Sequence, residues 1–180
     1  MTTIYYVRHG QTDMNAAGLW AGKTNAQLTD IGKQQAIKTA KDLENTKIDV
    51  AYVSPLDRAI NTFNYINEFH HLTPIIDKRI EERGFGEAEG KTSDETISKE
   101  KMYDWNLNSD FNIGVEKIKD AYKRVEEFLN ETLKNNKNKN ILIVAHGAIG
   151  RMFDVYFNGL PANGIILTGP KNGEVKIYSK

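Results

Sequence analysis

The chain has 180 residues, of which 39% are hydrophobic and 27% charged, a balance typical of a globular protein with a core of its own. Its 24 basic and 24 acidic residues cancel, so we expect neither nucleic acid nor membrane as a partner, and a few local groups must hold any anionic ligand. The chain lacks Cys, a membrane-spanning apolar run and a signal peptide, which favours a cytoplasmic protein without disulfides or cysteine metal sites.

Apolar runs and amphipathic stretches alternate along the first 76 residues. The β-branched and aromatic runs at 4–7, 50–53 and 74–76 predict strands, and residues 10–28, which lack a clean period, predict a loop. Two helices follow from the spacing of apolar side chains: one from Thr29 or Asp30 that buries Ala36, Ile37, Ala40 and Leu43, and one begun by Ser54-Pro55 that buries Ala59, Phe63 and Ile66.

The middle of the chain is more polar. Residues 77–90 are charged and rich in Gly, and they predict a loop. We expect 91–112 to form a short lid, with one amphipathic helix around Met102 and Trp105. The side chains of Met102, Tyr103 and Trp105 are expected to serve packing and not to contact substrate. Because such a segment decides which substrate is accepted, the sequence names no physiological substrate.

The last third returns to regular elements. The pattern predicts a long helix over 118–133, a surface turn at 134–140, a buried strand at 141–145, a helix through Met152 and Phe157, and a closing hairpin of 165–168 with 174–178. This alternation predicts a single α/β domain over 1–180. Its fold class is a three-layer α/β/α sandwich, with a mostly parallel central sheet and helices on both faces.

Two His-Gly pairs follow predicted strands. Arg8-His9-Gly10 comes after the first strand, and His146-Gly147 comes after the strand at 141–145. Ligand sites of open α/β sheets lie beyond the carboxyl ends of the strands, so we expect the two histidines to meet there. Each Gly would let its backbone N–H approach an anion closely, and a guanidinium binds phosphate through two hydrogen bonds. The pattern therefore predicts a phosphate site.

Six segments resemble the motifs of the histidine phosphatase superfamily, which contains cofactor-dependent phosphoglycerate mutases and many phosphomonoesterases. They are YVRHGQTDMN (6–15), NAQLTDIG (25–32), SPLDRA (54–59), ERGFGEAEG (82–90), GVE (114–116) and VAHG (144–147). The resemblance implies the phosphoglycerate mutase-like fold. It makes Arg58 the second phosphate-binding arginine, and among the neighbouring carboxylates it selects Glu82 as the general acid and base.

Phosphoryl transfer suits these side chains. A neutral imidazole attacks a phosphate dianion without the repulsion that an anionic nucleophile meets, so we expect His9 to be the nucleophile and to form a phosphohistidine. Arg8 and Arg58 disfavour a third positive charge and keep its ring neutral, while its other nitrogen donates to a carbonyl at Gly10 or beyond. We expect protonated His146 to stabilise the transferring phosphoryl group.

The rest of the predicted phosphate site consists of polar donors. Asn15 and a backbone N–H near Gly147 join Arg8 and Arg58, whereas Thr12 is mainly a turn former. Since two guanidinium groups and an imidazolium surround the phosphoryl oxygens, we expect neither a metal nor a cofactor.

Two competing signals carry less weight. The stretch AGLWAGKT (17–24) nearly spells a P-loop, but it begins with Ala17, and neither a preceding strand nor an immediately following helix is evident. His70 and His71 are adjacent and cannot share one helix face, and no carboxylate cluster near them supports zinc. We expect these two histidines to be surface residues at a helix end.

Together these patterns predict a metal-independent phosphomonoesterase that hydrolyses a small phosphorylated metabolite. The alternative is a cofactor-dependent phosphoglycerate mutase, but this chain has Phe85 in place of the mutase Tyr, Ser93 near the position of a Lys, and no Arg within 91–112. A second alternative is a protein that binds phosphorylated ligands without turnover, against which intact His9, His146 and Glu82 argue. Nothing in the sequence indicates the oligomeric state.

Overall fold

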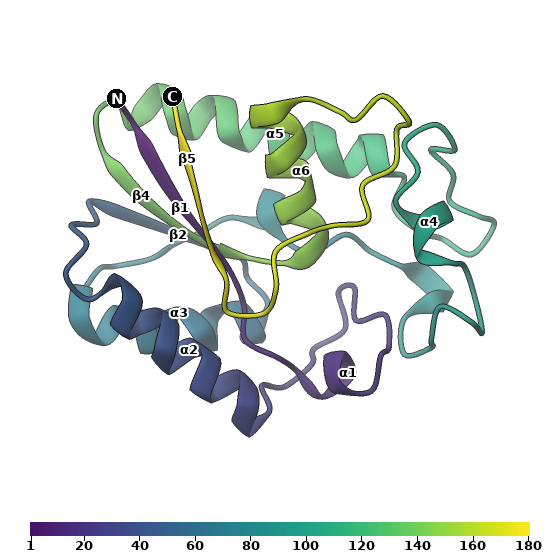
Figure 1. Ribbon diagram of the computed structural model, residues 1–180, viewed down its shortest axis with the longest axis horizontal. Coiled ribbons are helices and arrows are strands. Elements are labelled where there is room, and N and C mark those ends of the chain that lie inside the picture. The colour runs from purple at the N-terminus through teal and green to yellow at the C-terminus, as the bar shows by residue number, and fades with distance from the viewer.

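A five-stranded sheet runs through the centre of the molecule in the order β3-β2-β4-β1-β5 (Figure 1). The computed structural model describes residues 1–180. The strands are β1 (Thr3–Arg8), β2 (Val50–Val53), β3 (Ile75–Ile76), β4 (Asn140–Ala145) and β5 (Val175–Ser179). The first four are parallel, and β5 pairs antiparallel with β1 at one edge. The predicted mostly parallel sheet is confirmed.

Helices cover both faces of this sheet (Figure 1). One face carries α2 (Asp30–Leu43) and α3 (Asp57–His70), and the other carries α5 (Ile118–Asn135) and α6 (Gly147–Asn158). The short elements are α1 (Asp13–Ala16), α4 (Lys99–Met102) and the 3-10 turns η1 (Lys78–Ile80) and η2 (Gly86–Ala88). The predicted three-layer α/β fold is confirmed. None of the helices has both the length and the apolar character needed to cross a bilayer.

Strand β4 is buried on both sides because it lies in the middle of the sheet. Leu142 and Val144 join the core beneath α2 and α3, whereas Ile141, Ile143 and Ala145 join the core beneath α5 and α6. All five side chains are fully buried. A strand buried on two faces is apolar at every position, which explains the continuous apolar run in the sequence.

The predicted C-terminal hairpin of 165–168 with 174–178 is wrong. Strand β5 pairs along its whole length with β1, which offers a free sheet edge. Residues 165–168 form no strand, and Ile165 makes only an isolated bridge with Asp104. Arg151 donates hydrogen bonds to two carbonyls of this segment, so a side chain occupies acceptors that a hairpin ladder would have used.

The helices α2 and α3 differ in detail from the prediction. Helix α3 begins at Asp57, so residues 54–55 precede it and Pro55 does not lie in its first turn. In α2, Ile37 was predicted to be buried but is 38% exposed, whereas Thr39, two residues further on, is buried. The Thr39 hydroxyl donates to the carbonyl of Gly173, a contact from the other end of the chain that local periodicity does not reveal.

The helix predicted around Met102 and Trp105 is only one turn long. Helix α4 ends at Met102, and Trp105 lies beyond it. Both side chains are buried, and the Trp105 ring packs edge-on against Tyr122 of α5 with 5.0 Å between centroids. Their predicted role in packing is confirmed. Tyr103 is also buried in the core, but it lines the cavity over His9 as well. The lid-like role of 91–112 stays a prediction.

Gly10 and Gly32 bring the end of β1 and the start of α2 into backbone contact. A Cβ on Gly10 would lie 2.2 Å from the carbonyl oxygen of Gly32, far inside van der Waals distance. The N–H of Gly10 donates to Oγ1 of Thr62 at 3.1 Å. The expectation that this N–H approaches an anion is therefore wrong, and the missing side chain serves close packing of the loop against α2.

We predict that Gly10→Ala lowers the free energy of unfolding by about 1–3 kcal/mol, because the added methyl group must displace backbone atoms. Urea denaturation measures the effect. Gly84→Ala is the matched control, since a Cβ there meets no atom closer than 3.5 Å. Equal stability of the two variants would contradict the backbone contact.

Candidate active site

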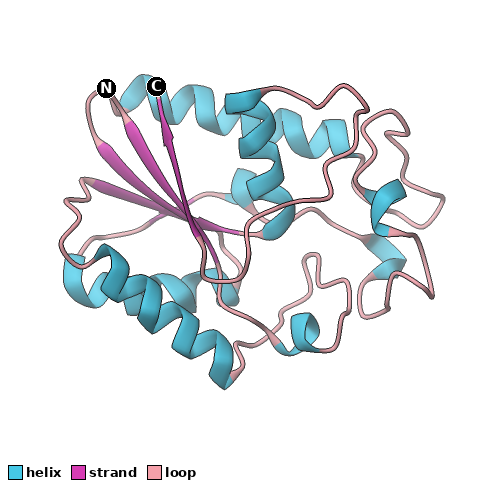
Figure 2. Cartoon of the chain, in the orientation of Figure 1, coloured by secondary structure: helices cyan, strands magenta, loops and turns pink.

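The predicted site residues meet at the carboxyl ends of three neighbouring parallel strands. His9 follows β1, His146 follows β4 and Ser54 follows β2. Arg8 stands opposite Ala145 in the ladder between β1 and β4, so the two histidines become neighbours, with 5.2 Å between ring centroids. The long loops gather beyond this end of the strands (Figure 2).

His9 is buried and held in one tautomer. Its Nδ1 lies 2.7 Å from the carbonyl oxygen of Gly10. A carbonyl can only accept, so Nδ1 carries the proton and Nε2 keeps a free lone pair. Burial lowers the pKa of His9 well below 6.5, and the positive charges of Arg58 and Arg8 lower it further. The ring is therefore a neutral base, and the Gly10 carbonyl fixes its orientation. This is the hydrogen-bond partner that the sequence analysis predicts.

His146 is fully buried beside His9. Its Nε2 lies 2.6 Å from Oγ of Ser54, and its Nδ1 has no partner. Burial, Arg58 and the neighbouring His9 lower the pKa of His146 well below 6.5. These surroundings favour the neutral ring, whereas a bound anion would favour its protonation. The imidazolium expected beside a bound phosphoryl group stays a prediction. Ser54 was missed as a site residue, although it follows a parallel strand as both histidines do.

The two arginines present unused donors to the site. Arg8 donates through Nη1 to Pro170 O at 2.8 Å, and Arg58 donates to Thr24 O at 2.8 Å and Gly22 O at 2.6 Å. The Nε atoms of both arginines are buried without a partner. Buried donors are rarely left unpaired in native proteins, so this pair indicates a site for an anionic acceptor. Arg58 is 1% exposed, which excludes an ordinary solvated helix residue.

Glu89 organises the loop that holds Arg58. Its carboxylate accepts hydrogen bonds from the backbone N–H groups of Lys23, Thr24 and Phe85 and from the Thr24 hydroxyl. The carbonyls of the same loop then bind the Arg58 guanidinium. Sequence reasoning did not single out Glu89 from the carboxylates near Glu82, and only the tertiary contacts reveal that it positions this arginine.

Glu82 is 8% exposed and lies against the first turn of α6. Its two carboxylate oxygens accept from the backbone N–H groups of Arg83 at 3.0 Å and Ala148 at 3.2 Å. From α5, Arg124 donates to the carbonyls of residues 79, 81 and 82 while paired with Glu116 at 2.8 Å. The backbone that carries Glu82 is therefore fastened to α5 by a side chain that sequence reasoning did not single out.

The remaining predicted donors have separate functions. The Asn15 carbonyl oxygen accepts from Thr12 N and Asn172 Nδ2, which leaves its amide NH₂ free to donate. Thr12 is fully buried and caps α1, so it acts as a turn former. Gly147 is the first residue of α6, where backbone N–H groups lack partners within the helix. Asn15 and Gly147 both line the cavity described next.

A cavity of about 300 Å³ opens over His9. It is lined by Arg8, His9, Asn15, Gly18, Leu19, Trp20, Ala21, Gly22, Arg58, Glu82, Phe85, Ser93, Lys99, Tyr103, Gly147, Arg151 and Leu167. The site therefore combines residues from the strand ends with three from 91–112. No group of three or more His, Asp or Glu side chains in the chain is arranged to hold a metal ion.

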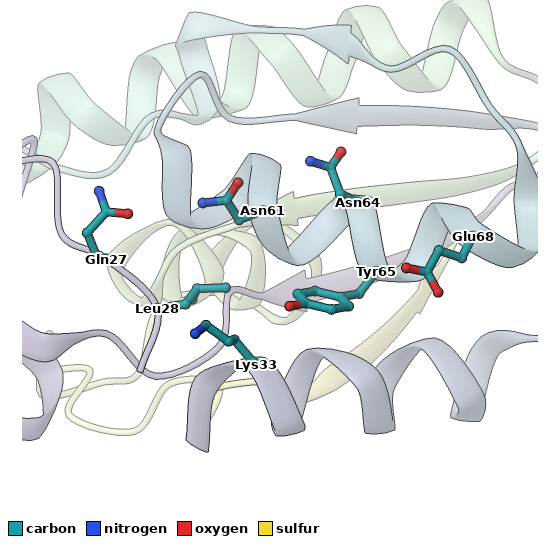
Figure 3. Close-up of a pocket in the computed structure, with 7 residues that line it drawn as sticks. All are labelled: Gln27, Leu28, Lys33, Asn61, Asn64, Tyr65 and Glu68. Atoms are coloured by element: carbon teal, nitrogen blue, oxygen red, sulfur yellow. The ribbon is translucent and has the colours of Figure 1, made fainter. Parts of the chain in front are cut away.

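A second cavity of about 320 Å³ lies between α2 and α3 (Figure 3). Its side chains are those of Gln27, Leu28, Lys33, Asn61, Asn64, Tyr65 and Glu68. It contains no histidine, and Lys33 pairs with Asp30 at 2.9 Å. It therefore lacks the combination of neutral base and unpaired cations found at His9. His70 ends α3 and His71 is exposed, so both occupy the predicted helix end.

We predict that the protein loses stability as the pH falls below about 6.5. His9 and His146 have lowered pKa values in the folded state, so below 6.5 the unfolded chain binds protons that the folded chain does not. Their stabilising contribution is complete above that pH and declines below it. Urea denaturation at pH 7.5, 6.5 and 5.5 measures how the free energy of unfolding changes with pH. His9→Ala and His146→Ala should reduce this pH dependence, and His71→Ala, at an exposed position, should not. An identical pH dependence in all variants would contradict the prediction.

Comparisons with known proteins agree with this geometry. The chain matches the family model of the histidine phosphatase superfamily (branch 1) over residues 4–179. It is 34% identical over 148 residues to PhoE, an uncharacterized phosphatase of Bacillus subtilis, with 82% of this chain and 73% of that protein covered. It is 29% identical over 189 residues to a 2,3-bisphosphoglycerate-dependent phosphoglycerate mutase of Bartonella bacilliformis, with 98% and 91% covered.

A solved structure extends the likeness to the whole fold. A mutant of phosphoserine phosphatase from Entamoeba histolytica, in complex with phosphoserine, has a TM-score of 0.83 and 28% identity. The match covers 98% of this chain and 90% of that one. The family match, the phosphatase relatives and the shared architecture agree with the motifs read from the sequence, and the chain belongs to the histidine phosphatase superfamily.

Proposed function

We propose that the protein is a metal-independent phosphomonoesterase that works through a phosphohistidine at His9. The observation that carries this proposal is the neutral His9 ring, whose Nε2 is free while Nδ1 is bound to Gly10. It lines a cavity with two arginines whose buried Nε atoms have no partner. A nucleophile and an anion site in one cavity are the parts that phosphoryl transfer requires.

In the first step, His9 Nε2 attacks phosphorus and the bond from phosphorus to the leaving oxygen breaks. Glu82, in its protonated form, gives its proton to that oxygen, so an alcohol leaves. Arg8, Arg58, Asn15 and the N–H near Gly147 hold the phosphoryl oxygens. The dianion also favours protonation of His146, which then donates from Nδ1.

In the second step, water attacks the phosphohistidine. The Glu82 carboxylate removes a proton from that water, the bond between phosphorus and Nε2 breaks, and inorganic phosphate leaves. Glu82 ends the cycle protonated and His9 ends it neutral, as they began. Two buried backbone N–H groups orient the Glu82 oxygens for both proton transfers.

The cavity volume supports a small substrate. At about 300 Å³ it lies at the small end of the roughly 300–1,000 Å³ of ligand pockets. Phosphatases of the superfamily act on small phosphorylated compounds, and one structural neighbour holds phosphoserine. We therefore propose a small phosphorylated metabolite as substrate.

A mutase is the second candidate, because the mutase relative is similar over 98% of the chain. Against it, the segment 91–112 contains no Arg, and the guanidinium of Arg83 is buried on the carbonyls of Glu116 and Met102. Product analysis separates the two functions. With 3-phosphoglycerate and 2,3-bisphosphoglycerate supplied together, a phosphatase releases phosphate, whereas a mutase forms 2-phosphoglycerate.

We predict that the protein, quenched during turnover of a ³²P-labelled monoester, carries acid-labile label on His9. His9→Ala should lose both the label and turnover, because His9 is the one imidazole among the residues that line the cavity. His71→Ala, at an exposed helix end, should keep both. Turnover retained by His9→Ala would refute the proposed function. So would an unmodified protein that binds phosphorylated ligands without hydrolysing them, the second alternative of the sequence analysis.

We predict that Glu82→Gln slows phosphoenzyme formation from alkyl phosphates by about 10²–10⁴, the usual contribution of a general acid. With p-nitrophenyl phosphate the loss should be much smaller, because the phenolate leaves without a proton. Rapid quenching isolates this first step from hydrolysis, which uses the same carboxylate. The control is Glu87→Gln on the exposed side of the loop. Equal losses with both leaving groups would remove Glu82 from the acid role.

A further inference from the structure

The cavity holds more positive charge than a phosphate requires. Arg8, Arg58, Lys99 and Arg151 line the same space as one carboxylate, Glu82. None of the four cations takes part in any of the eight ion pairs of the chain. A phosphate dianion and an ionised Glu82 together offset at most three of these four charges, so at least one positive charge is left without a counterion.

Arg151 is a fixed cation at the side of this cavity. Its Nε, Nη1 and Nη2 donate to the carbonyls of Ile166, Gly147 and Leu167 at 3.2, 2.9 and 2.8 Å. Its Cζ lies 4.2 Å from the centroid of the Tyr103 ring. A guanidinium has five N–H donors, so one on each terminal nitrogen is still available. Because all its partners are uncharged, its full positive charge remains available to an anion.

Lys99 is an exposed cation on the segment 91–112. It is the first residue of α4, and no carboxylate pairs with its ammonium group. Ser93, Lys99 and Tyr103 are the cavity residues that come from this segment. Lys101, two residues along the same helix, lines a different cavity formed by residues between 87 and 113. Within α4, the cavity over His9 thus receives Lys99 and not Lys101.

We infer that the substrate carries a carboxylate on its leaving alcohol, and that Lys99 and Arg151 bind this group. The inference rests on the proposed function, since it describes the other half of the same substrate. The leftover positive charge calls for a second anionic group. Leu19, Trp20, Phe85 and Leu167 give this cavity apolar walls, and its small volume suits a short carbon chain with a compact carboxylate.

The test compares ligand pairs that differ in the carboxylate. One pair is 3-phosphoglycerate and glycerol 3-phosphate, and the other is phosphoserine and phosphoethanolamine. Calorimetry on the His9→Ala variant measures the dissociation constants without turnover. We expect each carboxylate-bearing ligand to bind at least tenfold more tightly than its partner. Lys99→Gln, added to His9→Ala, should reduce this preference about tenfold, and Lys99→Glu should abolish it.

Lys101→Gln is the matched control and should leave the preference unchanged, because its side chain faces the other cavity. Arg151 is not substituted, since its loss would also release the backbone at 166–167. Equal binding within both pairs, or a preference that survives Lys99→Gln, would overturn the carboxylate subsite alone. Failure of all four ligands to bind would overturn the subsite together with the phosphate site, and turnover by His9→Ala would reject the proposed mechanism separately.

Discussion

The parallel hydrogen-bond ladder between β1 and β4 brings His9 and His146 to one edge of the sheet, although they lie near opposite ends of the chain. The Tyr6 hydroxyl reinforces this ladder at the site, because it donates to His146 O at 2.6 Å and accepts from His146 N at 3.1 Å. Burial raises the pKa of Tyr6 well above 10, so its proton stays in place. A slip of one residue would turn the side chains of β4 to the opposite faces and separate the two rings.

The arginines that pair with carboxylates differ from those that line the cavity. Arg79 and Arg124 pair with carboxylates, and both fasten loops or helices to each other. Those that line the cavity are held by main-chain carbonyls, which orient a guanidinium without cancelling its charge. Electrostatic stabilisation of a phosphoryl group needs such preorganised, uncompensated charge. The same charges oppose protonation of His9, so in the proposed function one arrangement both binds the anion and keeps the nucleophile neutral.

The local sequence pattern was enough to predict the parallel sheet, its covering helices and the meeting of His9 with His146. Alternating strands and helices imply parallel strands, and parallel strands end at the same edge of the sheet. The pattern failed to predict that β5 pairs with β1, more than 150 residues away, and not with 165–168. It also failed to predict that Thr39 is buried in α2 in place of Ile37, because the contact of Thr39 with Gly173 is not local. Ser54 escaped notice because its partner is the side chain of His146, far away in the sequence. Glu89 and Arg124 escaped notice because they bind backbone groups of distant loops. Glu82 needed the family motif, since spacing alone does not distinguish it from its neighbours.

Two parts of the chain line the cavity, and this separation affects how the substrate selectivity of the protein can evolve. The strand ends and the loops packed on them supply the residues around His9, including Arg8 and Arg58. The segment 91–112 supplies Ser93, Lys99 and Tyr103. Tyr103 contacts Arg151 of α6, whose guanidinium is held by main-chain carbonyls. Substitutions at Ser93 or Lys99 are therefore expected to leave His9, Arg8 and Arg58 undisturbed. New selectivity can evolve in this segment while the phosphoryl chemistry is inherited unchanged.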